Sequence, residues 1–397
     1  MIMKHNKISI IQRITYVIFL TLIVNACQNN QRVKNHSNQG NLAKTLTQKL
    51  SEVKPKDSNT LNLPHSSEKN NNDMARSNLE PIRKSFKKII KPMYKSHETQ
   101  AILSKKYMVA AANPLAAEAG LSILRAGGSA VDAAIATQLA LNVVEPQSSG
   151  IGGGAFLMHY HSRSRKIEAY DGRETAPAAA TPDMFLTAEG SRAKFHDVVP
   201  GGLSVGIPGV LRMLELSHKA HGKLPWNRLF DPAIKLAEEG FKISPRLFAL
   251  LRIDRHLKKF GPTKNLFFDA KGYTKPIGTV LTNQTLAQTF RLIAKEGAEA
   301  FYTGEIAIDI VKAIQKTSIN PGRMVLSDLA DYKAKKREPV CLFYKIWLVC
   351  GMPPPTSGGI TTLQILGILQ NKKIETLQPT SIESVHFITE ASKLAFA

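Results

Sequence analysis

The sequence contains 397 residues, of which 43% are hydrophobic, and its 53 Lys and Arg against 31 Asp and Glu give a formal net charge of +22. This length and apolar content fit a globular protein with a sizeable core, and they exclude collagen-like, coiled-coil and multi-span membrane proteins. Three Cys, one of them near the amino terminus, exclude a fold that depends on a disulfide framework or on a Cys-rich zinc module.

Residues 1–27 are typical of an export signal. A basic start precedes the apolar run Ile14–Val24, which is too short to span a bilayer. The run leads into Val24-Asn25-Ala26-Cys27, which resembles a bacterial lipobox, so Cys27 is the predicted lipid attachment site; a cleaved signal with an incidental Cys is the alternative. Because Gln28 rather than Asp follows the Cys, we expect a lipid anchor on the periplasmic side of the outer membrane.

Residues 28–106 predict a disordered basic tether. They are rich in Asn, Lys and Ser, carry few large apolar residues, and leave room only for a short helix over Ile82–Met93. Residues 1–106 hold 19 of the basic residues but only 6 of the acidic ones. A nucleic-acid groove would instead interleave basic and aromatic residues on a folded face, so we expect a solvated spacer and no nucleic-acid partner.

Regular elements are predicted from residue 107 onward. A helix over Pro114–Ala126 ends at two glycines, and a Ser129-to-Asp132 capping box begins an Ala-rich helix to Val143. The remaining expected elements are a hairpin of strands 155–160 and 166–171, helices over 208–218, 232–239, 286–295 and 306–315, and paired strands 340–343 and 346–350. Helices and hairpins without strict alternation predict a layered α/β or α+β domain.

Two sequence motifs suggest other chemistries. Gly150–Ala155 matches a dinucleotide-binding pattern, but a helix precedes it and a strand follows, which is the reverse of the required order, so we expect a tight turn. Gly202–Gly206 matches the nucleophile elbow of serine hydrolases, with His386 downstream. Since the next helix is expected to begin at Pro208, Ser204 would lie in the approach loop rather than at the elbow.

Two pairs of residues are candidates for a metal site and a disulfide. His159 and His161 point to the same face of a strand, as a metal pair would, but without a convincing third ligand nearby we expect a solvated hairpin end and no metal. Cys341 and Cys350 would lie opposite each other in a hairpin that turns at Lys345-Ile346. Lys-Ile is poor chemistry for a two-residue turn, so unpaired thiols are the favoured expectation.

An ordered series of motifs from residue 107 to residue 397 resembles the γ-glutamyltranspeptidases, also called glutathione hydrolases. The motifs comprise glycine-rich turns, helix starts and a Pro-rich stop. They are Asn113-Pro114, Gly127–Ala134, Glu145-Pro146, Gly150–Gly154, Asp171–Pro177, Val205–Gly209, Asp231–Ala237, Phe301–Gly304, Asp328–Tyr332 and Pro353–Gly359.

This resemblance implies a layered αββα N-terminal nucleophile hydrolase fold, here expected as an incomplete large-subunit part, and no cofactor. The family precursor cuts itself into two subunits, and the Thr at the new amino end attacks the γ-glutamyl amide of glutathione. The acyl group then passes to water or to an acceptor amino acid. By the same resemblance, Arg173 in Asp171–Pro177 is the residue expected to hold the α-carboxylate of the glutamyl group. The alternative is an Arg paired with Glu174 or Asp171.

The nucleophile has no counterpart in this sequence, so no catalytic residue is assigned. Thr361-Thr362 is the nearest pair, but the residues after it are typical of a helix. We therefore expect a chain truncated before the catalytic Thr, inactive alone, with a small subunit as heterodimer partner. A glutamate-binding lipoprotein without catalysis and a Ser204 serine hydrolase are the alternatives.

Overall fold

The computed structural model describes residues 102–397, and residues Lys106–Ala397 form one compact unit. The predicted signal segment with Cys27, the helix over Ile82–Met93 and nearly all of the predicted tether lie outside the described residues. In the part of the chain that is described, no helix is both long enough and apolar enough to cross a membrane.

Helices α4 (Pro114–Arg125) and α5 (Ala130–Val144) confirm the two helices predicted there, and they pack closely on each other. The capping box is present: Asp132 N–H donates to the Ser129 hydroxyl at 3.1 Å, and the Asp132 carboxylate accepts from Ser129 N–H at 2.8 Å. A Cβ on Gly120 would lie 2.1 Å from Thr137 Oγ1, so a larger residue there would push the two helices apart.

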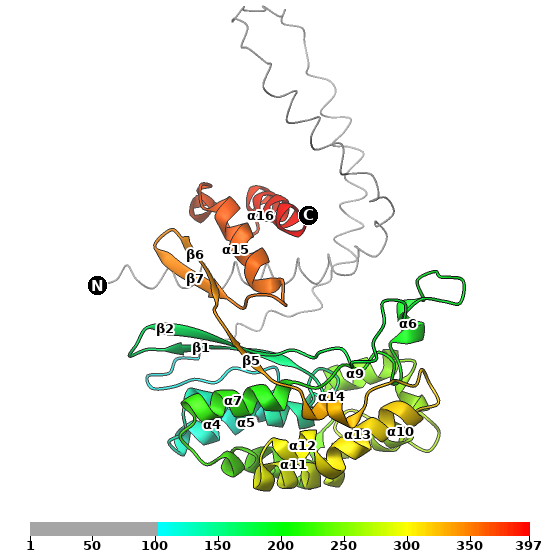
Figure 1. The fold of residues 1–397 in the computed structure, drawn as a ribbon. Helices are drawn as coiled ribbons and strands as arrows, with labels where there is room; N and C mark the ends of the chain where they lie inside the picture. Colours follow the sequence, from blue (N-terminus) through cyan, green and yellow to red (C-terminus); the bar gives the residue numbers. More distant parts are fainter. Residues whose placement is uncertain (1–101) are drawn as a thin grey trace, which may run out of the picture. The chain divides into compact units, whose positions relative to one another are not determined.

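A three-stranded antiparallel sheet, in the order β1-β2-β5, lies against the helices (Figure 1). The predicted hairpin of β1 (Ala155–His161) and β2 (Lys166–Gly172) is confirmed, with Ala155 opposite Gly172. Strand β5 (Lys335–Arg337) adds to the other edge of β2. Helix α7 (Val210–His221) packs on β1 and β2 and contacts α5, so the core lies between this sheet and the helical layer.

Most of the other elements belong to the helical layer. The helices are α6 (Phe195–Val198), α8 (Asp231–Glu239), α9 (Pro245–Ile253), α10 (Gly261–Phe267), α11 (Gln284–Glu296), α12 (Glu299–Tyr302), α13 (Gly304–Lys316) and α14 (Leu326–Ala330), with 3-10 turns Trp226–Leu229 and Leu257–Lys259. A small two-stranded sheet pairs β3 (Phe241–Lys242) with β4 (Val280–Leu281). This mixture of helix and strand confirms the predicted fold class.

The last segment packs on itself. Hairpin β6 (Val340–Tyr344) and β7 (Trp347–Gly351) contacts α15 (Gly358–Leu369), which in turn packs on α16 (Ile382–Phe396); a 3-10 turn, Ile374–Thr376, lies between the two helices. Cys341 and Cys350 are directly opposite in the register and form a disulfide, so the expectation of unpaired thiols was wrong. Lys345 adopts φ 56°, the left-handed conformation that the tight turn needs.

Candidate functional site

Three loops that are far apart in sequence meet at the carboxyl end of β2. The Gly150–Gly154 loop enters β1, the Asp171–Pro177 segment leaves β2, and Val205–Gly209 enters α7. Gly209 N–H and Val210 N–H both donate to the carbonyl of Gly153, at 3.0 and 3.1 Å. Ile207 N–H donates to the Thr175 carbonyl at 2.8 Å. Backbone hydrogen bonds therefore tie the three loops into one surface.

Glycines make this close approach sterically accessible. A Cβ on Gly209 would lie 2.3 Å from the Gly172 carbonyl oxygen and 2.1 Å from Tyr332 Oη. A Cβ on Gly172 would meet Met213 Cβ at 2.6 Å. Only glycine lets the end of β2 pass this near to the start of α7.

The backbone of Arg173 is held from two sides. The buried Asp171 carboxylate accepts a hydrogen bond from Arg173 N–H at 2.8 Å and another from Arg337 Nε at 2.7 Å. The Tyr332 hydroxyl donates to the Arg173 carbonyl at 2.8 Å. Burial raises the pKa of Tyr332 to about 12, so this hydroxyl keeps its proton at neutral pH.

The Arg173 guanidinium is open to solvent. Its side chain is 57% exposed, and Nη1 lies 2.5 Å from Glu174 Oε2. Within residues 102–397, this is the one hydrogen bond that the guanidinium makes. Glu174 in turn borders the glycine loop, because a Cβ on Gly154 would lie 2.6 Å from its carboxylate. The ion pair between Arg173 and Glu174, which the sequence left open as the alternative, is thus present. The backbone of Arg173 is held in place and its guanidinium remains accessible.

The other candidate nucleophiles lie in unsuitable positions. Ser204 is in a turn, and its hydroxyl donates to the Val199 carbonyl at 2.6 Å rather than to a histidine. Helix α7 begins six residues later, at Val210, so Ser204 is not at a strand-to-helix elbow. Thr361 lies inside α15 and is buried, which matches the helix expected there.

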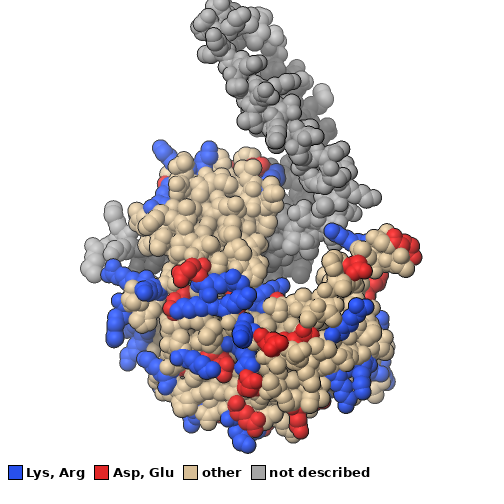
Figure 2. All heavy atoms as spheres, in the orientation of Figure 1, with Lys and Arg blue, Asp and Glu red and all other residues tan. Residues whose placement is uncertain are grey.

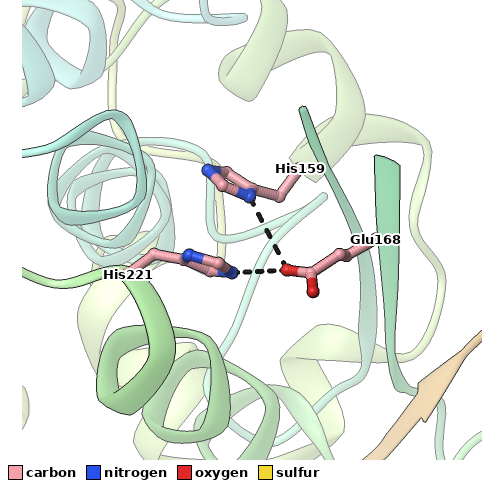
Figure 3. A group of neighbouring side chains, drawn as sticks. All are labelled: His159, Glu168 and His221. Atoms are coloured by element: carbon pink, nitrogen blue, oxygen red, sulfur yellow. Dashed lines mark hydrogen bonds and ion pairs between the residues drawn. The ribbon is translucent and has the colours of Figure 1, made fainter. Parts of the chain in front are cut away.

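The two predicted strand histidines do not form a pair. His161 faces Ser164, with Nδ1 and the hydroxyl 2.9 Å apart, at the exposed hairpin end. His159 instead lies beside Glu168 of β2 and His221 at the end of α7 (Figure 3). Sequence inspection missed His221, because it lies 62 residues after His159 and only the packing of α7 on the hairpin brings it there.

Comparisons with known proteins match the compact unit to one family. The family model described as "Gamma-glutamyltranspeptidase" matches residues 116–397. The glutathione hydrolase proenzyme of Bacillus subtilis is 38% identical over 298 residues, which is 75% of this chain and 50% of that protein. Glutathione hydrolase 2 of Arabidopsis thaliana is 39% identical over 301 residues, again 75% of this chain and 50% of the relative. The chain therefore spans about half the length of the curated relatives it matches.

A solved structure has a similar fold. The γ-glutamyltranspeptidase of Helicobacter pylori is similar with a TM-score of 0.71 at 35% identity, over 75% of this chain and 84% of that one.

Proposed function

Because the chain belongs to the γ-glutamyltranspeptidase family, we propose that residues 107–397 form the part of a glutathione hydrolase that binds the γ-glutamyl group. The likeness to γ-glutamyltranspeptidase structures gives this unit the N-terminal nucleophile hydrolase fold. The proposed reaction is attack of a Thr hydroxyl on the γ-glutamyl amide, departure of the amine, and transfer of the acyl group to water or to an amino acid.

Arg173 is the residue we propose for the α-carboxylate of the substrate. A planar guanidinium binds a carboxylate through two parallel hydrogen bonds, which fixes the orientation of the bound group. The support is the combination of a backbone held by Asp171 and Tyr332 with an exposed guanidinium. The Glu174 contact is an exposed ion pair, which contributes little free energy, so a substrate carboxylate can compete for the guanidinium.

A small-subunit polypeptide is the proposed source of the nucleophilic Thr, as heterodimer partner. The exposed apolar surface of the last segment supports this assignment. In that segment, Phe343 is 65% exposed and Ile382 is 91% exposed. Figure 2 shows the region of β6 to α16 as mostly uncharged on the face in view. Apolar surface of this kind marks a site where another polypeptide packs.

The test is hydrolysis of γ-glutamyl-p-nitroanilide by the chain alone and with the part of the Bacillus subtilis relative that this chain does not match. We expect turnover only when both polypeptides are present. In that complex, Arg173→Ala should raise KM by about tenfold to a hundredfold, since charge-assisted hydrogen bonds contribute about 1.5–3 kcal/mol. Arg163→Ala is the matched control, because Arg163 is exposed in the β1–β2 turn.

Three outcomes would contradict different parts of this proposal. Turnover by the chain alone would mean that the nucleophile lies within residues 1–397, and its loss in Ser204→Ala would identify a serine hydrolase. An unchanged KM in Arg173→Ala would remove Arg173 from the site. Calorimetric binding of glutamate without turnover in any combination would favour the glutamate-binding lipoprotein.

We also propose that Cys27 carries a lipid and holds the protein on the periplasmic side of the outer membrane. The Cys341–Cys350 disulfide supports export, because disulfides persist in oxidising compartments. Metabolic labelling with a tritiated fatty acid should mark the wild-type chain and leave Cys27→Ser unlabelled. Labelling of Cys27→Ser, or release of the wild-type protein from membranes by salt alone, would contradict the anchor.

A further inference from the structure

A cluster of two imidazoles and one carboxylate lies outside the Arg173 site. His159 on β1 and Glu168 on β2 are opposite each other in the strand register, and His221 is the last residue of α7. Glu168 Oε2 is 2.7 Å from His221 Nε2 and 3.9 Å from His159 Nδ1. Figure 3 shows the two imidazole rings stacked, with centroids 3.8 Å apart, and a dashed line from one nitrogen of each ring to the same carboxylate oxygen.

The cluster is mostly shielded from water, and one of its nitrogens has no hydrogen-bond partner. The three side chains are only 14%, 19% and 16% exposed for His159, Glu168 and His221. His159 Nδ1 is buried and has no hydrogen-bond partner among the described residues. Burying a polar atom without a hydrogen-bond partner costs folding free energy. An unprotonated imidazole nitrogen of this kind has a lone pair that is available to a cation.

Burial and neighbouring charges favour the ligand forms of His159 and Glu168. Burial, followed by the nearby His221, lowers the pKa of His159, so its ring is neutral at physiological pH. Lys336 binds the other oxygen of Glu168, and this contact lowers the pKa of the carboxyl to about 2. Oε2 therefore remains as the charged oxygen that faces the imidazoles. Tyr170 Oη lies 2.8 Å from His221 Nε2 and 3.1 Å from Glu168 Oε2, at the border of the cluster.

We propose that His159, Glu168 and His221 bind one divalent transition-metal ion of the zinc class. Two imidazole nitrogens and one carboxylate oxygen are a ligand set that zinc takes in proteins, whereas Mg²⁺ and Ca²⁺ require oxygen ligands. Ligands at 2.0–2.1 Å from a tetrahedral ion are about 3.3 Å apart. The observed separations of 2.7 and 3.9 Å lie on either side of that value, and all three candidate ligand atoms lie within 4.8 Å of one another.

Binding is a proton-coupled exchange. The hydrogen bond between His221 Nε2 and Glu168 Oε2 is replaced by two bonds to the ion. A neutral His221 ring then carries its proton on Nδ1, and a protonated ring releases its Nε2 proton to solvent. His159 supplies its unpartnered Nδ1 without losing a hydrogen bond. Water fills the fourth position, next to the Tyr170 hydroxyl.

The position of the site gives the ion a structural role. Glu168 precedes Arg173 by five residues along β2, which corresponds to about 16 Å of strand, so the ion would not touch the glutamyl group. It would instead join the outer end of the β1–β2 hairpin to the carboxyl end of α7. The opposite end of α7 begins at Gly209 and Val210, whose N–H groups hold the glycine loop beside Arg173.

The experiment is a Zn²⁺ titration of the full chain, without an affinity tag, after removal of metal by a chelator. Isothermal calorimetry should show one high-affinity ion with a micromolar or lower dissociation constant, and Zn²⁺ should raise the thermal midpoint. Co²⁺ should give the intense visible absorption of a tetrahedral complex. His159→Ala and His221→Ala should each weaken binding by at least about a hundredfold, because loss of outer-shell partners alone costs up to that factor.

His161→Ala is the matched control, since His161 lies on the same strand but faces Ser164. It should bind Zn²⁺ like the wild type. Glu168→Gln and His159→Asn, with far-UV circular dichroism, serve where an alanine variant fails to fold. Binding of Zn²⁺ to the wild type only at millimolar concentration would indicate an adventitious surface ion only and would overturn the proposed site. Equal losses of affinity in His161→Ala and His159→Ala would overturn it as well. These readouts are independent of γ-glutamyl turnover.

Discussion

The hydroxyl of Tyr332 donates a hydrogen bond to the backbone carbonyl of Arg173 at 2.8 Å, across 159 residues of sequence. The Tyr332 ring also stacks on Tyr302, with ring centroids 5.9 Å apart. The loop that follows α14 therefore supports the residue proposed to bind substrate.

Removing this hydroxyl should loosen Arg173 without removing its charge. In the reconstituted complex, we expect Tyr332→Phe to raise KM for a γ-glutamyl donor about fivefold, because a hydrogen bond contributes about 1 kcal/mol. Steady-state kinetics should show the change in KM rather than in kcat. Tyr273→Phe is the control, since Tyr273 is exposed. An unchanged KM in Tyr332→Phe would mean that Asp171 alone is enough to position Arg173.

The Asp171 carboxylate should contribute to folding stability. It is buried and accepts hydrogen bonds from Arg173 N–H and from Arg337 of β5. Asp171→Asn replaces a charged acceptor by a neutral amide, so we expect a loss of about 2 kcal/mol in the free energy of unfolding by urea. Asp309→Asn on the exposed face of α13 should stay within about 0.5 kcal/mol of the wild type. Equal midpoints for the two variants would contradict this role for Asp171.

Close approach of the backbone should make Gly209 intolerant of a side chain. A Cβ there would be 2.3 Å from the Gly172 carbonyl oxygen, and the backbone on both sides is hydrogen-bonded. We expect Gly209→Ala to lower the thermal midpoint strongly or to abolish soluble expression. Gly152→Ala is a matched control in the same site, because nothing lies within 4 Å of its added Cβ. Similar stability of both variants would show that the loop relaxes easily.

The disulfide should stabilise the hairpin of β6 and β7. Cys341 and Cys350 enclose a short loop, and closing a loop of this length contributes about 2–3 kcal/mol in the chain-entropy account. Reductant should therefore lower the urea midpoint of the wild type and leave a Cys341→Ser/Cys350→Ser double variant unchanged. Reactivity of both cysteines toward a thiol reagent in the oxidised native protein would contradict the bond.

Local sequence signals were sufficient to predict elements whose interacting residues are close together in the sequence. Ser129 and Asp132 form the predicted capping box because both partners lie within one helical turn. The β1–β2 hairpin follows from two strand-like stretches joined by a short turn. Helix α9 was missed although Ser244 and Pro245 form an N-cap and first-turn signal that the sequence carries.

Other features depended on contacts between distant segments. Helix α7 begins at Val210 rather than at the predicted Pro208. The N–H groups of Gly209 and Val210, which the start of a helix leaves without an intrahelical partner, donate to the carbonyl of Gly153. Strand β5 is a charged Lys-Lys-Arg stretch without a strand pattern, and it is a strand because it pairs with β2.

The sequence by itself determined the family, the main helices and hairpins and the candidate Arg173, because ordered motifs and local periodicity are properties of the chain read along its length. Tertiary structure alone decided which side chains meet. The hydrogen bond from Tyr332 to Arg173, the Cys341–Cys350 bond and the approach of His221 to Glu168 each depend on packing and strand register. Such distances are set by many weak contacts acting together, and no single stretch of residues records them.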